Sequence, residues 1–417
     1  MRRISVSLAP KTVRSIRLFG LLVAQLCAYS MLSALCFACP LYLFDCSGSS
    51  TLYGAVAAIA FIPGVLATPV GGILADRGRH RGVLVVLGIV LMAASLLFIP
   101  MKRSLPLAVV VAAMLCVQYG IQSLLKPMLQ IEEVRMTGQE KVERATALVS
   151  QIIMMSNILG PVVGTAVYGC FGIDTLCETA ALTFTISALL FGGALKQNAS
   201  SETMGDSATR TTRRNVFREL IRYLSQNSSL LVVFLIAAIL NLALVGLTIG
   251  APVIVAKHLG MQSSFVGIIE VAMGLGGLVG SGLVGIWPHR FSFKGICRYV
   301  AMICFGVVPI IVTLLSGPDE LAFAALAAGS AWVMAWASIT SVEIVSFVQR
   351  SAPKELCGKV LALVYMTLSC ATPIGQLVYG LAYDRWTPAI VFAGMLAVLT
   401  LTTALFYRLK SRLWRLS

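Results

Sequence analysis

A series of long apolar runs, separated by short polar turns, is the feature that most constrains how this chain folds. About twenty mostly apolar residues make a helix long enough to cross the hydrocarbon core of a membrane. Because the runs are uninterrupted, they do not suit the alternating strands of a barrel, and twelve transmembrane helices are predicted. The runs lie near 16–43, 51–74, 83–101, 105–130, 145–170, 176–195, 230–256, 264–286, 296–316, 320–346, 359–383 and 387–407.

The composition agrees with burial in lipid. Of the 417 residues, 58% are hydrophobic and 12% are charged, and the mean hydropathy is +0.90. A soluble domain carries about a quarter charged residues, so a large soluble helical enzyme is a poor alternative. The predicted fold class is an all-α polytopic membrane protein, with twelve helices in two six-helix bundles that are pseudo-repeats of each other.

Lysine and arginine are unevenly distributed between the two sides of the predicted membrane. Most of them fall in the N-terminal tail, in alternate turns and in the C-terminal tail, whereas the turns of the opposite side carry only Lys102, Arg103, Lys257 and Arg385. Cytoplasmic loops are enriched in these residues, so both termini are predicted to be cytoplasmic. This bias also accounts for the net charge of +15, and no nucleic-acid partner is expected.

One long hydrophilic stretch divides the predicted helices into six and six. The expected domains are an N-terminal bundle at 1–195, a linker at 196–229 and a C-terminal bundle at 230–417. The second part of the linker has apolar residues at i, i+3, i+4 and i+7, which predicts an amphipathic helix on the inner leaflet. The fifth and eleventh runs both begin Ala-Leu-Val, pass a proline and end G-x-x-x-Y-G, a trace of an internal repeat.

The turn "GGILADRGRHRG" at 71–82 resembles a loop signature of the major facilitator superfamily, G-x-L-A-D-R-x-G-R-[KR]. The resemblance implies a conformational-switch motif made by Gly72, Asp76, Arg77 and Arg81. A carboxylate interacts favourably with the positive N-terminal end of a helix dipole. Asp76 is therefore expected to meet such a helix end, that of the eleventh run, in one of two domain arrangements.

The fifth run contains "GPVVG" at 160–164, which resembles the helix 5 signature of drug:proton antiporters in Gly160, Pro161 and Gly164. The segments at 144–151 and 348–363 are similar to those of the drug, macrolide-efflux and enterobactin-exporter branch. The resemblance implies a drug:proton antiporter. An arginine common in the fourth helix of the wider superfamily is replaced by Leu115, so no proton relay through that position is implied.

Polar residues inside the apolar runs are the candidates for handling protons and substrate, because each is costly unless it faces a cavity or a partner. Glu270 is the acid farthest from a run end and is the candidate proton carrier, although an acid wetted at the outer mouth is an open alternative. The further candidates, for which packing between helices is an equal alternative, are Glu343, Gln118, Gln122, Asn157, Asn241 and Gln376.

These observations predict a secondary active transporter that exports an amphipathic small molecule, such as a drug, macrolide or siderophore, by proton antiport with alternating access. An importer or facilitator on the same fold is the alternative. Neither an enzyme nor a metal site is expected, because no nucleophile or metal-ligand constellation occurs. No cofactor is expected beyond the proton gradient. The expected location is a plasma membrane of the bacterial inner-membrane type, and the expected partners are substrate, proton and lipid, with the protein as a monomer.

Overall fold

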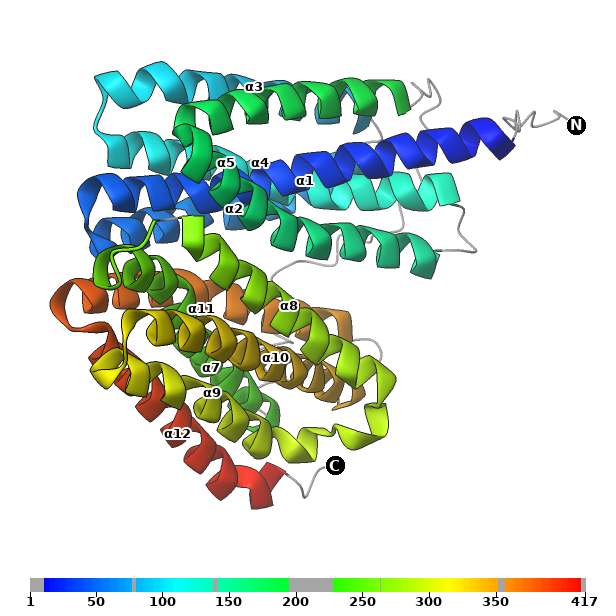
Figure 1. Ribbon diagram of the computed structural model, residues 1–417. Coiled ribbons are helices and arrows are strands. Elements are labelled where there is room, and N and C mark those ends of the chain that lie inside the picture. Colours follow the sequence, from blue (N-terminus) through cyan, green and yellow to red (C-terminus); the bar gives the residue numbers. More distant parts are fainter. Residues whose placement is uncertain are drawn as a thin grey trace, which may run out of the picture. The chain divides into compact units, whose positions relative to one another are not determined.

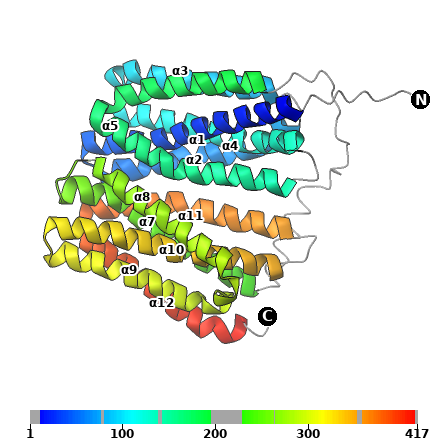
Figure 2. The ribbon, with the colours of Figure 1, turned by 45° about the vertical axis from the view of Figure 1, so that its right-hand side comes forward.

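The computed structural model describes residues 11–76, 80–137, 142–194, 228–262, 264–351 and 357–413. Throughout these ranges the regular structure is helical, which confirms the predicted fold class (Figures 1 and 2). Helices satisfy their own backbone hydrogen bonds and therefore suit a chain that lies in lipid. The first part of the chain forms α1 (Lys11–Ser47), α2 (Ser50–Asp76), α3 (His80–Ser104), α4 (Leu107–Thr137) and α5 (Val142–Ala194).

The second part of the chain forms the long helices α7 to α12 and three short helical turns. The long helices are α7 (Ser228–Pro252), α8 (Ser264–Ile286), α9 (Ile296–Ser316), α10 (Asp319–Ser351), α11 (Cys357–Arg385) and α12 (Pro388–Leu413). The short turns are η2 (Val253–His258), η3 (Pro288–Arg290) and η4 (Phe293–Gly295).

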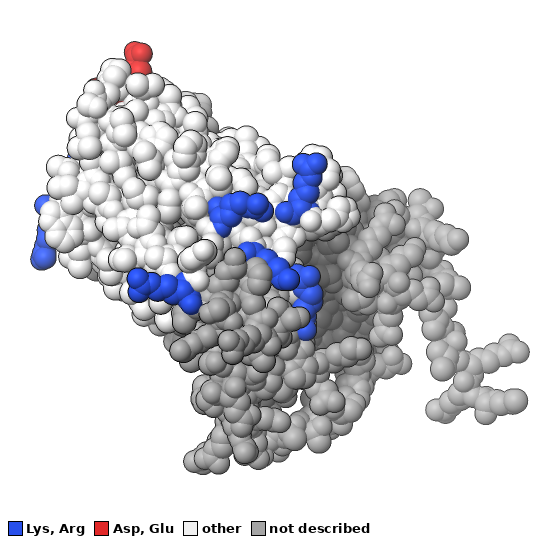
Figure 3. Space-filling model, turned by 90° about the horizontal axis from the view of Figure 1, so that it is seen from below, with Lys and Arg blue, Asp and Glu red and all other residues white. Residues whose placement is uncertain are grey.

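Ten helices of the described residues are long and apolar enough to cross a membrane. One of them, α5, covers both the fifth and the sixth predicted runs, because a kink at Gly172 divides it. Gly172 has φ 84°, a left-handed conformation that glycine adopts without strain. Figure 3 shows a face of the molecule on which residues without charge predominate, as expected for a surface in contact with lipid.

The chain forms two compact units. Unit 1 comprises Met1–Leu43 and Ile59–Met204, and unit 2 comprises Phe44–Ala58 and Gly205–Ser417. The first residues of α2 therefore belong to unit 2 and the remainder of α2 to unit 1. The predicted linker at 196–229 lies almost entirely outside the described residues, so its amphipathic helix stays a prediction.

Unit 1 places the glycines of the helix 5 motif against α1. A Cβ atom on Gly160 would collide with Ser33, and one on Gly164 would lie 2.7 Å from the backbone oxygen of Ala34. Only a residue without a side chain permits so close an approach of two helices in a membrane. The motif residues Gly160, Pro161 and Gly164 are all buried in this contact region of α5.

In unit 2, glycines permit the same close packing between α8 and α10. A Cβ atom on Gly276 or on Gly280 would collide with the backbone oxygen of Ala331 or Ala335, respectively. Close helix approach through small residues is the usual way that membrane helices gain packing energy, since lipid removes the hydrophobic drive for association. The packing fixes α10 beside α8 and so positions the side chains of the candidate site.

The end of α7 departs from regular α-helix. It continues as the π-helical turn η2, in which the Leu259 N–H donates to the Ile254 oxygen at 2.8 Å and the Met261 N–H to the Val255 oxygen at 2.9 Å. A π-helical turn is wider than an α-helical one and frequently occurs at functional sites. Here it carries Lys257, which contacts α11 and the turn before α2.

Candidate functional site

Unit 2 contains a pocket of about 360 Å³ with walls from α7, α9, α10 and α11. Its size lies within the range of ordinary small-molecule sites. Much of the wall is aliphatic or sulfur-containing, from Leu240, Leu244, Val245, Ile303, Met334, Ile344 and Val345, with small side chains at Ala237 and Ala337. The residues that line it include no acid, lysine, arginine or histidine.

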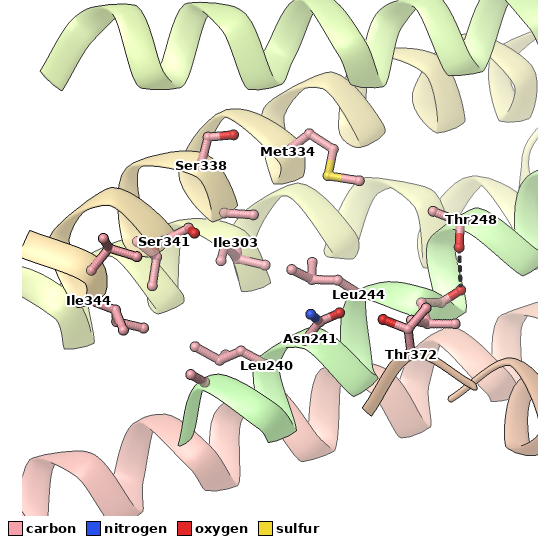
Figure 4. A pocket seen from close by; sticks show the side chains of 15 residues that line it. Leu240, Asn241, Leu244, Thr248, Ile303, Met334, Ser338, Ser341, Ile344 and Thr372 are labelled. Carbon is pink, nitrogen blue, oxygen red and sulfur yellow. Dashed lines mark hydrogen bonds between the residues drawn. The ribbon is translucent and has the colours of Figure 1, made fainter. Parts of the chain in front are cut away.

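Polar groups of the pocket come from two walls (Figure 4). Ser338 and Ser341 project from α10, while Asn241 of α7 and Thr372 of α11 lie on the other side of the space. Leu244 and Ile303 lie between these groups. The arrangement offers a ligand an apolar middle and hydrogen-bonding groups at two edges.

The hydroxyl groups around the pocket differ in whether they donate a hydrogen bond to a backbone oxygen of their own helix. Thr248 bonds the Val245 oxygen at 2.9 Å, and Thr340 bonds the Trp336 oxygen at 2.7 Å. Ser338 is half-buried and Ser341 exposed, and neither hydroxyl has a hydrogen bond within the part of the chain that the structure describes. The two α10 serines therefore retain their donor and acceptor capacity for another molecule.

Glu270 is outside the pocket lining but on a helix face that approaches it. A Cβ atom on Gly277 would lie 3.3 Å from the Ser338 hydroxyl oxygen. Glu270 precedes Gly277 by about two helical turns, which places it on the same face of α8 at a distance of roughly 10 Å along the axis. It is half-buried, lies within electrostatic range of Tyr53, and has no ion pair among the residues that the structure describes.

A second polar cluster, the α2–α11 junction, lies in unit 2 at the start of α2. The Asp384 carboxylate of α11 accepts hydrogen bonds from the Ser50 N–H at 2.9 Å, the Thr51 N–H at 2.8 Å and the Ser49 hydroxyl at 3.0 Å. Lys257 lies 3.7 Å from the same carboxylate and donates to the Gly48 oxygen at 3.4 Å. The first N–H groups of a helix lack partners within that helix, so Asp384 caps α2 from another element.

The junction also depends on close backbone contact. A Cβ atom on Gly54 would collide with the backbone oxygen of Gln376, and one on Gly380 would lie 2.7 Å from the Ser50 oxygen. Partial burial alone would raise the pKa of Asp384, but the hydrogen bonds from Thr51, Ser50 and Ser49 outweigh it and lower that pKa to about 2. Asp384 is thus a fixed negative charge at neutral pH.

The remaining candidate residues fall in different surroundings. The backbone oxygen of Gln376 contacts the junction at Gly54, and its side-chain oxygen is buried without a hydrogen-bond partner among the described residues. Gln118 is fully buried in unit 1 and accepts a hydrogen bond from the Cys36 thiol at 3.1 Å. Gln122 is half-buried on α4, and Asn157 is exposed on α5. Of the amide candidates, only Asn241 lines the pocket.

Glu343 is placed in a contact between helices rather than in the pocket. Its side chain is buried, lies 3.9 Å from the Arg350 guanidinium and accepts a hydrogen bond from the Phe293 backbone at the start of η4. The carboxylate therefore links the end of α10 to the turn before α9. This surrounding is that of an interface residue.

The structure describes no side chain of the four residues predicted to form the switch motif at 71–82. Gly72 and Asp76 are in α2 and Arg81 is in α3, but the structure describes none of their side chains, and Arg77 lies outside the described ranges. The contact expected of Asp76 therefore stays a prediction. No group of three or more metal-ligating side chains occurs among the described residues.

Sequence reasoning missed Ser338, Ser341, Thr372 and Asp384. Serine and threonine are ordinary residues in membrane helices, where they usually bond their own backbone, so the α10 pair carried no signal of its own. One pattern in the sequence could have indicated the pocket wall. Small, polar or flexible residues recur at helical spacing along one face of α10, at Ser330, Met334, Ala337 and Ser341. For the junction, the corresponding pattern was an acidic residue, Asp384, directly at the end of an apolar run.

The fold is shared with several solved transporters. A bacterial homolog of the human lysosomal transporter Spinster, in an inward-facing and unoccupied conformation, has a TM-score of 0.72 at 12% identity, covering 97% of this chain and 98% of that one. A bacterial homologue of the iron transporter ferroportin gives 0.72 at 14% identity, covering 94% and 98%. The nucleoside transporter NupG gives 0.70 at 13% identity, covering 94% and 98%.

At these identities the likeness establishes the fold but not a substrate. No curated protein matches the sequence. The family model of the Major Facilitator Superfamily matches residues 21–375, which is most of the chain. The chain therefore belongs to the Major Facilitator Superfamily, and it is a secondary transporter of a small substrate rather than an enzyme.

Proposed function

We propose that the protein exports an amphipathic small molecule in exchange for protons, and that the pocket of unit 2 holds the substrate. The observation that carries this proposal is the pocket itself, which combines an apolar wall with polar groups at two edges. An apolar cavity with a few well-placed polar groups is the usual form of a site for such molecules. The resemblance of Gly160, Pro161 and Gly164 to an antiporter signature supports export over import.

Glu270 is the proposed proton carrier. It lies on the α8 face that approaches Ser338, about two turns farther along the helix, and no ion pair among the described residues holds its charge. Removal from water makes the charged form of a carboxylate unfavourable, so an acid in this position can exchange a proton when the cavity opens to either side. Ionisable residues inside membranes commonly serve such relays.

The α2–α11 junction is proposed to break and re-form during alternating access. α2 belongs to unit 2 through Ala58 and to unit 1 from Ile59. A movement of one unit against the other would therefore strain the hydrogen bonds at the capped end of this helix. Asp76 at the other end of α2 is proposed to act in the same way on a helix N-terminus. Transporters of this kind exchange such contacts between two arrangements of their repeats.

The test is uphill transport in proteoliposomes with an imposed pH gradient. A panel of amphipathic drugs, macrolides and siderophores is loaded on the side corresponding to the cytoplasm, with the protein oriented by a protease-sensitive tag. Efflux that ceases on addition of an uncoupler is expected. Glu270→Gln should abolish accumulation against a gradient but preserve downhill exchange, because the amide cannot change its charge.

Glu320→Gln is the matched control, since Glu320 is an exposed carboxylate at the start of α10. It should transport like the parent. Accumulation that survives Glu270→Gln with a normal pH dependence rules out the proton-carrier assignment. Uptake in the opposite direction only would establish the importer instead.

A further inference from the structure

Within the proposed function, we infer that Ser338 and Ser341 are the residues that select the substrate, and that they select an uncharged apolar group bearing a hydroxyl or carbonyl. This inference rests on the pocket being the substrate site. Ser338 and Ser341 would be the side chains that recognise the ligand, and the ligand that the pocket binds would be neutral.

The hydroxyl groups of the pocket differ in their hydrogen bonding. Serine and threonine in a helix commonly satisfy their hydroxyl by bonding a backbone oxygen three or four residues earlier. Thr340, between the two serines, does so at 2.7 Å, and Thr248 does so across the pocket at 2.9 Å. Ser338 and Ser341 make no such bond among the described residues, so their hydroxyls remain available to another molecule.

Ser338 and Ser341 lie close together on α10. They are three residues apart on α10, a spacing that places side chains on one face with Cβ atoms about 5–6 Å apart. Both are among the residues that line the pocket. In Figure 4 Ser341 lies on the side of α10 that faces α7, whereas the Ser338 hydroxyl lies on the side toward α8, where a Cβ atom on Gly277 would be 3.3 Å from it. A hydroxyl or carbonyl of a ligand that is seated on the aliphatic wall can therefore bond to Ser341, and Ser338 offers a second hydroxyl toward the α8 side of the pocket.

A charged group placed in an apolar pocket without an opposite charge loses hydration worth several kcal/mol. The residues lining the pocket include no acid and no base. The acid next to Ile344 in α10, Glu343, lies 3.9 Å from Arg350 and contacts the Phe293 backbone. The pocket therefore favours a neutral ligand over a cation or an anion of the same shape.

A matched set of four probes tests the inference at equilibrium. The probes are 1-naphthalenemethanol, 1-methylnaphthalene, 1-naphthylmethylamine and 1-naphthoic acid, which share one aromatic body and differ in charge and hydrogen bonding at neutral pH. Binding to the full-length protein in nanodiscs is measured by equilibrium dialysis, and binding to empty nanodiscs is subtracted. Without a proton gradient the result is independent of transport, so a failure of the proposed antiport leaves this test intact.

The alcohol should bind saturably and more tightly than the amine or the acid. The double variant Ser338→Ala with Ser341→Ala should weaken the alcohol about tenfold and leave 1-methylnaphthalene unchanged, because one or two hydrogen bonds are lost. Ser281→Ala is the control, since Ser281 lies outside the pocket lining and its hydroxyl already bonds the Gly277 oxygen within α8 at 3.0 Å, and this variant should bind all four probes like the parent. Equal or tighter binding of the amine or acid, unchanged alcohol binding in the double variant, or no saturable binding of the alcohol each overturns the inference.

Discussion

The pocket and the α2–α11 junction are both polar clusters of unit 2, but they use their polar atoms in opposite ways. At the junction, Asp384 accepts three hydrogen bonds and lies near Lys257. In the pocket, Ser338 and Ser341 have no such bonds among the described residues. Groups bonded within the protein hold an arrangement of helices, whereas groups left unbonded beside a cavity are free to recognise a ligand.

The largest effect is expected from filling the pocket. Ala337→Phe would add an aromatic ring to a cavity of about 360 Å³ and occupy much of the space of a ligand. We expect the affinity for 1-naphthalenemethanol to fall by roughly a hundredfold, measured by equilibrium dialysis, because ring and ligand compete for the same apolar wall. The thermal unfolding midpoint should change little, since the ring enters empty space. An affinity within threefold of the parent would place the ligand elsewhere.

A side chain at the junction should instead affect stability. In Gly54→Ala the new methyl group would collide with the backbone oxygen of Gln376, which cannot rotate away. Overpacking of this kind costs about 1–3 kcal/mol, so the thermal unfolding midpoint should fall while probe binding to the remaining folded protein persists.

Gly394→Ala is the matched control for this substitution, because a Cβ atom at Gly394 of α12 meets nothing within 4 Å. It should leave the midpoint unchanged. If both variants unfold at the parent's temperature, the close contact of α2 with α11 contributes nothing to the stability of unit 2.

A smaller effect is expected at Asp384. Asp384→Asn retains one acceptor oxygen but loses the charge that faces the start of α2, and a lost helix cap costs about 1 kcal/mol. The hydrogen-bonded carboxylate has a pKa lowered to about 2. Its stabilisation is therefore complete above the ordinary aspartate pKa of about 4 and is lost only as the pH falls through about 2.

Consequently, the difference in unfolding midpoint between the parent and Asp384→Asn should be constant from pH 5 to pH 8. Asp384→Glu, which keeps the charge, should recover part of the loss. A difference that disappears between pH 7 and pH 5 would mean that Asp384 titrates there, and the cap would then be a pH-sensitive contact.

The sequence was sufficient to predict the helical membrane fold, because lipid requires long apolar runs and the positions of these runs follow from hydropathy. It also named Asn241, which lines the pocket, as one of several amide candidates, and on the same grounds it named Gln118 and Gln376, which lie in packed surroundings. An amide in an apolar run has the same sequence signal in both places. Whether an amide lines a cavity or packs between helices depends on which helix is its neighbour, and hydropathy does not predict the neighbouring helix.

The junction was beyond prediction for a related reason. Asp384 and Ser50 are 334 residues apart in the chain, and their contact depends on the close approach that Gly54 and Gly380 permit. Glycines are frequent in all membrane helices, so their alignment across two helices could not be read from either segment alone. For the α10 serines, the missing information was that their hydroxyls bond no backbone oxygen of α10, which depends on side-chain conformation and is not encoded in hydropathy.

The central claim is that the substrate occupies the pocket, and cysteine protection tests it most directly. Ser338→Cys in the pocket and Ser49→Cys at the junction are labelled with the neutral reagent methyl methanethiosulfonate, and each site is followed by mass spectrometry. The account predicts that saturating 1-naphthalenemethanol slows labelling of Ser338→Cys at least fivefold and leaves Ser49→Cys unaffected. Equal rates at Ser338→Cys with and without the alcohol would contradict it.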